Sequence, residues 1–400
     1  MGSKVMAAAL AVALGSSAVF IADPAVAQDS DAAEIAQLKA QLAQLQAKVA
    51  ELEQRSNAQS AINASTQQHI EAMQQKQPEK TPAADEWASS TKIGGTMFAD
   101  FTNIDQTKNG QKTDLSGTGL DVKRFYLSVD HKFTDIWSAN LTTDFNYTSA
   151  TGETQLFVKK AYLQGAFSPM ATLRVGSAGL PWTSLAEDFY GYRFVEDTLV
   201  PRTKFGTTAD WGLHLLGDNG VFNYQASVIN GGGYKNPTRS NSVDFEGRIG
   251  VQPVKGLMFA LGGYSGDLGK DTSSTPALHT AHRYDALAAY NANGLRLGAE
   301  WFQADNWNNV NTAVTDSADG WSLWGSYDFS VASLFARYDS VKPSKDVDPS
   351  LKDTYYNLGV AFPVTKGVRV AVAYKNENLK DDTSTDVKTR EIGAWGEVKW

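Results

Sequence analysis

The stretch Trp137-Ser138-Ala139-Asn140-Leu141-Thr142-Thr143-Asp144-Phe145-Asn146-Tyr147 alternates between two kinds of side chain. The odd positions are apolar apart from one threonine, and the even positions are polar. Because successive side chains of a strand point to opposite faces, this stretch predicts a long strand with one apolar face and one face in water. Strands of about ten residues with this alternation are typical of barrels that span a membrane, whereas strands in globular proteins average about five or six residues.

The same period of two recurs throughout the chain from Thr91 onward. It predicts sixteen strands, at 91–101, 120–132, 136–147, 154–167, 170–178, 206–216, 220–230, 241–251, 256–266, 281–291, 294–304, 319–329, 331–340, 353–362, 367–378 and 386–400. Tight turns alternate with longer polar loops between these segments, and an even number of strands leaves both ends of a barrel on the periplasmic side. We therefore expect an all-β fold, a 16-stranded antiparallel transmembrane β-barrel over residues 91–400.

The composition excludes several classes of protein. The 400 residues are 42% hydrophobic, so most of the chain is not disordered. Its 36 basic residues against 44 acidic ones give a net charge of −8, which argues against a nucleic-acid partner. The absence of cysteine excludes disulfides and thiol catalysis. Beyond the first thirty residues, no run of eighteen apolar residues could cross a bilayer as a helix.

The first residues have the pattern of an export signal. Lys4 precedes an apolar stretch over 5–14, and Ala25-Val26-Ala27 fits the small-x-small site that a signal peptidase cleaves. We expect a signal peptide over residues 1–27. A short membrane anchor is the alternative.

A short α-helical coiled coil is predicted over residues 28–56, in the periplasm. Apolar residues recur at spacings of three and four, at Ile35, Leu38, Leu42, Leu45, Val49 and Leu52. This is the heptad seam of a parallel coiled coil, in which Glu34 would pair with Lys39 and Lys48 with Glu53 of neighbouring chains. The alternative is an isolated amphipathic helix. The Gln-rich stretch that follows predicts a fraying helix and then an extended linker, together over 57–90.

The order of the predicted parts and two short segments carry a resemblance to a known family. The signal peptide, the short Leu-rich coiled coil, the sixteen-strand pattern, Lys160-Ala161-Tyr162-Leu163-Gln164 and the segment from Gly206 to Leu213 resemble the phosphate-selective porins O and P of Gram-negative bacteria. The last strand ends on Trp400, an aromatic residue of the kind with which outer-membrane barrels commonly end. The resemblance implies a homotrimeric channel in the outer membrane, constricted by its third external loop. That loop matches residues 179–205.

The constriction loop has a mixed charge. Family members tend to carry an aromatic-x-Glu-Arg stretch there, whereas this chain has Phe194-Val195-Glu196-Asp197. The charged residues of the loop are Arg193, Arg202 and Lys204 against Glu187, Asp188, Glu196 and Asp197.

The polar faces of the strands would place Arg124, Lys160 and Arg174 on the wall of the lumen near this loop. A cationic wall facing an acidic loop across water would create a transverse field with only mild charge selectivity. We expect these three wall residues and the seven charged loop residues to line the constriction.

The sequence thus favours a porin, a passive diffusion channel for small hydrophilic solutes and inorganic ions, with anions such as phosphate implied by the resemblance. We expect no enzyme, since no Ser, His and acid are arranged as a nucleophilic site. We also expect no cofactor and no metal, because His279-x-x-His282 has no third ligand at a suitable spacing. The expected partners are outer-membrane lipid, solutes, identical subunits and peptidoglycan. An outer-membrane to cell-wall tether that uses the coiled coil and an outer-membrane enzyme barrel are the alternatives.

Overall fold

The computed structural model describes residues 27–75, 87–149 and 151–400, which form two separate units, a helix and a barrel. Residues 1–26, which hold almost all of the expected signal peptide, and residues 76–86 of the expected linker lie outside the described residues.

The helical unit is α1, Ala27–Gln75, and it is longer than the sequence predicted. Residues 57–75, expected to fray into the linker, remain helical because they contain neither glycine nor proline and are rich in alanine and glutamine. Leu42, Leu45, Val49 and Leu52 are each more than half exposed in the single chain. Their seam is therefore free to pack against other chains, and the coiled coil stays a prediction. None of the described helices is both long enough and apolar enough to span a membrane.

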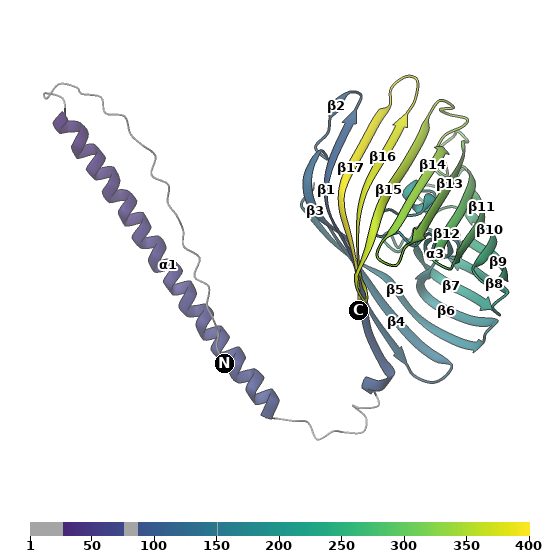
Figure 1. Cartoon of the computed structure of the whole chain (residues 1–400), viewed down its shortest axis with the longest axis horizontal. Coiled ribbons are helices and arrows are strands. Elements are labelled where there is room, and N and C mark those ends of the chain that lie inside the picture. The colour runs from purple at the N-terminus through teal and green to yellow at the C-terminus, as the bar shows by residue number, and fades with distance from the viewer. Residues whose placement is uncertain (1–26, 76–86, 150) are drawn as a thin grey trace. The chain divides into compact units, whose positions relative to one another are not determined.

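The barrel has sixteen antiparallel strands in its wall, as predicted (Figure 1). They are β1 Thr91–Lys108, β3 Gly117–Lys132, β4 Trp137–Thr148, β5 Glu153–Ser168, β6 Ala171–Gly179, β7 Ala209–Asp218, β8 Phe222–Ile229, β9 Asp244–Val254, β10 Leu257–Gly266, β11 Ala281–Ala292, β12 Leu295–Asp305, β13 Ser317–Asp328, β14 Ser333–Lys342, β15 Lys352–Thr365, β16 Val368–Lys380 and β17 Asp386–Lys399. The two-residue β2, Gln111–Lys112, only extends the connection between β1 and β3. Pairing of β1 with β17, from Thr96 opposite Lys399 to Lys108 opposite Val387, closes the ring.

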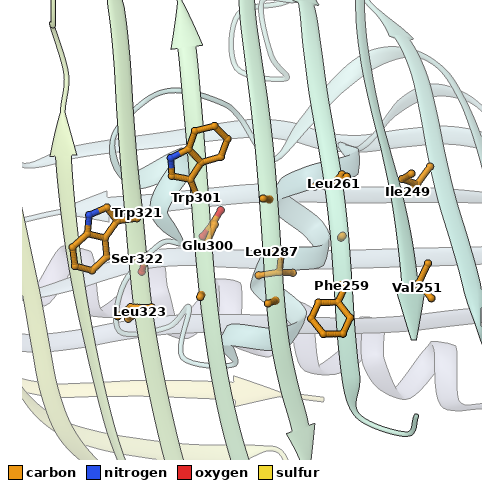
Figure 2. Close-up of a pocket in the computed structure, with 14 residues that line it drawn as sticks. Ile249, Val251, Phe259, Leu261, Leu287, Glu300, Trp301, Trp321, Ser322 and Leu323 are labelled. Atoms are coloured by element: carbon orange, nitrogen blue, oxygen red, sulfur yellow. The ribbon is translucent and has the colours of Figure 1, made fainter. Parts of the chain in front are cut away.

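The outer face of the wall is apolar. On β12 and β13, Trp301 and Leu323 are exposed while their neighbours Glu300 and Ser322 are buried inside. A depression of about 850 Å³ crosses this face from β9 to β13, between Phe259 on one side and the tryptophans Trp301 and Trp321 on the other (Figure 2). It lies on the surface that meets lipid, so it is not part of the route that a solute takes through the barrel.

The C-terminal residue secures the closure of the barrel. Trp400 and Gly95 of β1 exchange two backbone hydrogen bonds, each 3.2 Å long. The indole ring of Trp400 lies over Gly95, where a Cβ atom would come within 2.3 Å of it, and its centroid is 5.5 Å from that of Phe125. Glycine at position 95 thus leaves room for the last aromatic residue to cover the seam between the first and last strands.

We predict that Trp400→Ala reduces the amount of assembled, heat-modifiable barrel, because the seam between β1 and β17 loses its aromatic cover. The measurement is the fraction of compact barrel on unheated gels of outer-membrane extracts. Trp87→Ala, which removes an equally exposed tryptophan ahead of β1, is the matched control and should assemble normally. An unchanged yield for Trp400→Ala would show that the terminal aromatic residue is incidental.

Candidate functional site: the loop within the barrel and the passage beside it

The segment between β6 and β7, residues 180–208, folds inward against the wall of the barrel. It contains α3, Pro181–Tyr190, and the single turn α4, Leu199–Arg202. Pro181 occupies the first turn of α3, where its missing N–H costs nothing, and Gly191 ends that helix with a φ of 75°. Trp182, Phe194 and Leu199 are completely buried, so the loop has an apolar core of its own against the wall.

Five wall side chains, and Trp307 from the connection after β12, hold this loop by donating hydrogen bonds to its backbone carbonyl groups. The pairs are Arg248 to Pro181 at 2.8 Å, Arg369 to Gly191 at 3.0 Å, Lys123 to Val195 at 2.8 Å, Arg337 to Asp197 at 2.5 Å, Trp307 to Lys204 at 3.0 Å and Arg283 to Phe205 at 2.7 Å. A carbonyl buried away from water needs a donor, and a loop without regular structure cannot supply enough of them itself. These donors are mostly cationic, which makes the bonds stronger than neutral ones.

Ion pairs fix the far side of the loop. Arg202 lies 2.8 Å from Asp339, 3.1 Å from Asp353 and 2.7 Å from Glu377, so this loop cation meets an acidic wall. Glu196 of the loop lies 2.9 Å from Lys375. We expected an acidic loop and a cationic wall separated by water. This is wrong at Glu196, which forms a direct ion pair with the wall, and the signs are reversed at Arg202, where the loop carries the cation and the wall carries the acids. Both groups are largely enclosed, and charges enclosed together in low dielectric form direct pairs.

The Glu196 carboxylate remains ionised in this setting. Burial alone would raise the pKa of Glu196, but the ammonium groups of Lys375 and Lys123 outweigh burial and hold the pKa well below its usual range. A carboxylate with a lowered pKa contributes stability at neutral pH, and that contribution is lost as the pH falls through the lowered value. The pairing of Glu196 with Lys375 therefore persists through mildly acidic conditions.

On the opposite side of the loop, two chambers lie between the loop and the wall. The inner chamber, of about 330 Å³, reaches Thr96 and Lys399 near the short-turn rim. The outer chamber, of about 280 Å³, reaches Tyr147 and Thr148 near the connection from β4 to β5. Phe98 and Arg193 line both chambers, and the Arg193 guanidinium lies 5.7 Å from the centroid of the Phe98 ring. We call the place beside these two residues, where the chambers meet, the constriction.

Arg193 is held in place at this constriction. Its guanidinium lies 2.5 Å from Glu187 and 3.5 Å from Asp197, and it donates a hydrogen bond of 2.9 Å to the hydroxyl of Tyr126. Two of the four loop acids are thus paired within the loop itself. The acidic side of the expected transverse field is correspondingly weakened.

Two β-bulges bring extra lysines into the lumen. The pairing of β1 with β3 slips at Lys123, and the pairing of β4 with β5 slips at Lys159. At each slip two successive side chains point inward, Lys123 with Arg124 and Lys159 with Lys160. Lys159 donates a hydrogen bond of 3.1 Å to Tyr126, and Lys123 contacts the loop as described above. The wall that faces the loop is therefore more cationic than the alternation alone indicates.

The predicted site residues divide between these places. Arg124 and Asp197 line the outer chamber, Lys160, Glu187 and Asp188 the inner one, and Arg193 both, whereas Glu196 and Arg202 lie in ion pairs and Lys204 lines a separate cavity. Arg174 lines neither chamber and donates a hydrogen bond of 2.8 Å to Gln164. It is three residues from the start of β6, about 10 Å along the strand, which places it between the short-turn rim and the constriction.

Lys123 and Lys159 are not among the predicted site residues, because a strict period of two turns both of them outward. A signal was nevertheless present. An outward lysine at the membrane midplane costs about 2 to 4 kcal/mol, so a Lys-Arg or Lys-Lys pair inside a transmembrane strand indicates a bulge that brings both residues inside. Phe98 and Tyr126 gave no comparable signal, since aromatic residues occur on both faces of such a wall.

Comparisons with known proteins agree with this architecture. The family described as phosphate-selective porin O and P matches residues 91–262. An anion-selective porin from Comamonas acidovorans is 13% identical, with a TM-score of 0.56 over 78% of this chain and 99% of that one. OmpF of Salmonella typhi, in complex with daunomycin, is 11% identical with a TM-score of 0.53, over 78% and 97%. The trimer form of OmpT from Vibrio cholerae is 14% identical with a TM-score of 0.51, over 78% and 99%. No curated protein sequence matches the chain.

The closed sixteen-stranded barrel with a loop folded into its lumen defines a porin of the Gram-negative outer membrane. The match over residues 91–262 confirms the similarity to the phosphate-selective porins O and P. The solved structures are all less than 25% identical to this chain, so they support the fold and nothing further.

We predict that Arg202→Gln loosens the loop, because three carboxylates lose a shared cation. Breaking a buried ion pair typically costs about 3 to 5 kcal/mol, so the barrel should unfold at lower denaturant concentration and conduct with a noisier open channel. Urea unfolding and single-channel recordings measure the two effects. Arg390→Gln, at an exposed position of β17, is the control and should change neither. A quiet channel of unchanged stability would contradict the anchoring role of Arg202.

Proposed function

We propose that this porin is a diffusion channel for small hydrophilic solutes that prefers anions, and that the lysines at the two bulges set this preference. The observation that carries the proposal is the placement of Lys159 and Lys160 together in the inner chamber, directly before the constriction. Lys159 is buried and bound to Tyr126, whereas Lys160 is half-buried, so a passing solute would meet Lys160 more directly.

The charge balance of the inner chamber favours anions. Its cationic lining residues are Lys159, Lys160, Arg193, Arg369 and Lys399, and its acidic ones are Glu187, Asp188 and Glu397. Of the acids, Glu187 is paired with Arg193, and Glu397 is paired with Arg369 at 2.6 Å. Lys160 forms no ion pair within 4 Å among the described residues, although Glu187 and Asp188 interact with it electrostatically. Charged side chains that line a pore select ions by sign, so the excess of five cations over three carboxylates in this chamber favours anions.

The replacement of the family's arginine by Asp197 is compatible with this proposal. Arg193, on the other side of the aromatic Phe194, directs its guanidinium to the constriction. The cation therefore comes from one residue before the aromatic position instead of three residues after it. The family's description as phosphate-selective and the anion-selective porin among the structural neighbours add support.

We predict that replacing Lys159 and Lys160 together by Gln shifts the reversal potential toward cations under a salt gradient. The shift should shrink at 1 M salt, where the Debye length falls to about 3 Å. Arg174→Gln removes a lumenal cation between the short-turn rim and the constriction and is the matched control, with a much smaller expected shift. An equal shift in both variants would mean that selectivity is spread over the whole lumen and is not set at the bulges.

The proposal includes assembly as a homotrimer. One neighbour is a trimer form, and the exposed seam of α1 would give three parallel helices an apolar surface to share. The tether remains a second candidate, because the 49-residue α1 leaves Leu42, Leu45, Val49 and Leu52 exposed for a partner other than the barrel. An enzyme barrel has less support, since the fold and the family point to a channel and no cluster of His, Asp and Glu among the described residues could hold a metal ion.

We predict that deleting residues 28–85 lowers the stability of the trimer without abolishing the barrel, because the seam of α1 is lost while all sixteen wall strands remain. Native gels in mild detergent at increasing temperature measure the dissociation. Replacing Leu45 and Leu52 by Ser, which keeps the helix but removes seam contacts, should have a smaller effect in the same direction. A monomer for the intact protein would contradict trimer assembly.

A further inference from the structure

A cavity of about 230 Å³ lies on the other side of the loop from the passage. It is enclosed by the end of the inward loop, at Lys204 and Gly206, and by residues of three long connections, which follow β8, β10 and β12. Long connections form the outer rim of such barrels, so this cavity faces the external medium. Neither Phe98 nor any of the bulge lysines lines it.

The floor of the cavity is apolar. Leu180, Ile229, Tyr264 and Trp307 line it, and all four are more than nine-tenths buried. The rings of Tyr264 and Trp307 lie 4.9 Å apart between centroids and are inclined by 58°, so they form two walls of an aromatic corner. Aromatic and aliphatic side chains together suit the hydrocarbon part of a small molecule.

The rim of the cavity carries two cations that the protein itself does not neutralise. Lys204 and Lys270 line it, and neither ammonium group has an ion pair or a hydrogen bond within the described part of the chain. The carboxylates nearby are already occupied. Asp210 accepts hydrogen bonds from the backbone of Trp211, Gly231 and Gly233, and Glu246 is paired with Arg283 at 3.1 Å. Three cations, Lys204, Lys270 and Arg283, line the cavity against two carboxylates, Asp210 and Glu246, so its net charge is positive.

The backbone around the cavity is held in unusual conformations. Lys204 has a φ of 65° and Leu268, which also lines the cavity, a φ of 56°. Each such conformation costs a non-glycine residue of order 1 to 3 kcal/mol, so other contacts must fix it. Trp307 holds the carbonyl of Lys204, and Asp244 accepts a hydrogen bond of 2.8 Å from the N–H of Leu268. The shape of the cavity is thus set by the fold.

We infer that this cavity binds a small amphipathic organic anion, an aryl or alkyl carboxylate, at the outer mouth of the porin. The hydrocarbon part would rest on the surface of Leu180, Ile229, Tyr264 and Trp307, and the carboxylate would lie between Lys204 and Lys270. The volume is below the roughly 300 to 1,000 Å³ of sites for drug-sized ligands, which limits the ligand to about one ring. This inference does not depend on the anion preference of the passage.

The probe for the test is 4-bromobenzoate, whose bromine can be located by anomalous scattering. Crystals of the full chain grown with it should show bromine over Trp307. Calorimetric titration should show binding that weakens at least tenfold in the double variant Lys204→Gln, Lys270→Gln. The neutral analogue 4-bromobenzamide should bind the unaltered protein at least tenfold more weakly than the acid.

Two controls separate this site from the passage. Lys159→Gln with Lys160→Gln should leave the affinity for 4-bromobenzoate unchanged, and Lys366→Gln, in a short turn, should do the same. Bromine found only beside Lys159 and Lys160 would overturn the inference, as would equal affinity in the Lys204, Lys270 variant or equal binding of acid and amide. A Leu268→Ala variant that keeps its barrel but loses the affinity would support a site shaped by the fold.

Discussion

Hydrogen bonds from cationic wall residues to backbone carbonyls of the inward loop are the interaction on which the inside of this barrel depends. A segment of about thirty residues without strands exposes many carbonyl groups, and they must find donors inside the wall. Arginines at 248, 283, 337 and 369 supply these donors from four different strands. The loop therefore packs against one side of the wall. The two chambers of the passage lie on one side of the loop, and the cavity lined by Lys204 lies on the other.

Because these arginines bind the loop, a charged residue that points into the lumen does not necessarily act on a passing solute. An arginine bound to a buried carbonyl is oriented by the loop, and Arg337 is in addition paired with Asp339 at 2.7 Å. Such a residue contributes to the stability of the loop and little to the field that a solute meets. The lysines at 159 and 160 lie in the chamber beside the passage and differ in this respect. Counting inward charges along each strand cannot separate the two roles, because both kinds obey the same alternation.

The alternation of polar and apolar residues was sufficient to predict the strands of the wall, but it was not sufficient to predict the residues at the constriction. Trp137 to Tyr147 and its fifteen counterparts predicted every strand of the barrel, since lipid outside and water inside impose opposite chemistry on neighbouring residues. The bulges at Lys123 and Lys159 interrupt that rule at the constriction, where a strict period of two fails. The partners of Glu196 and Arg202 could not be predicted from the sequence either. They lie on β14 to β16, and only the path of the folded loop brings them close. Helix α1 extends beyond the predicted end of the coiled coil. Its last part consists mainly of polar residues with high helix propensity, and these do not show the heptad spacing from which the coiled coil was predicted.

The pairing of β1 with β17 also determines when this protein can fold. Thr96 and Lys399 are about 300 residues apart in the chain, and a contact of that separation forms late, because the entropy of closing so long a loop must first be overcome. Until Trp400 is available, every set of paired strands has two open edges with apolar outer faces, which invite aggregation in water. Closure of the ring removes both edges at once, so the order in which the strands pair decides how long apolar surface stays exposed.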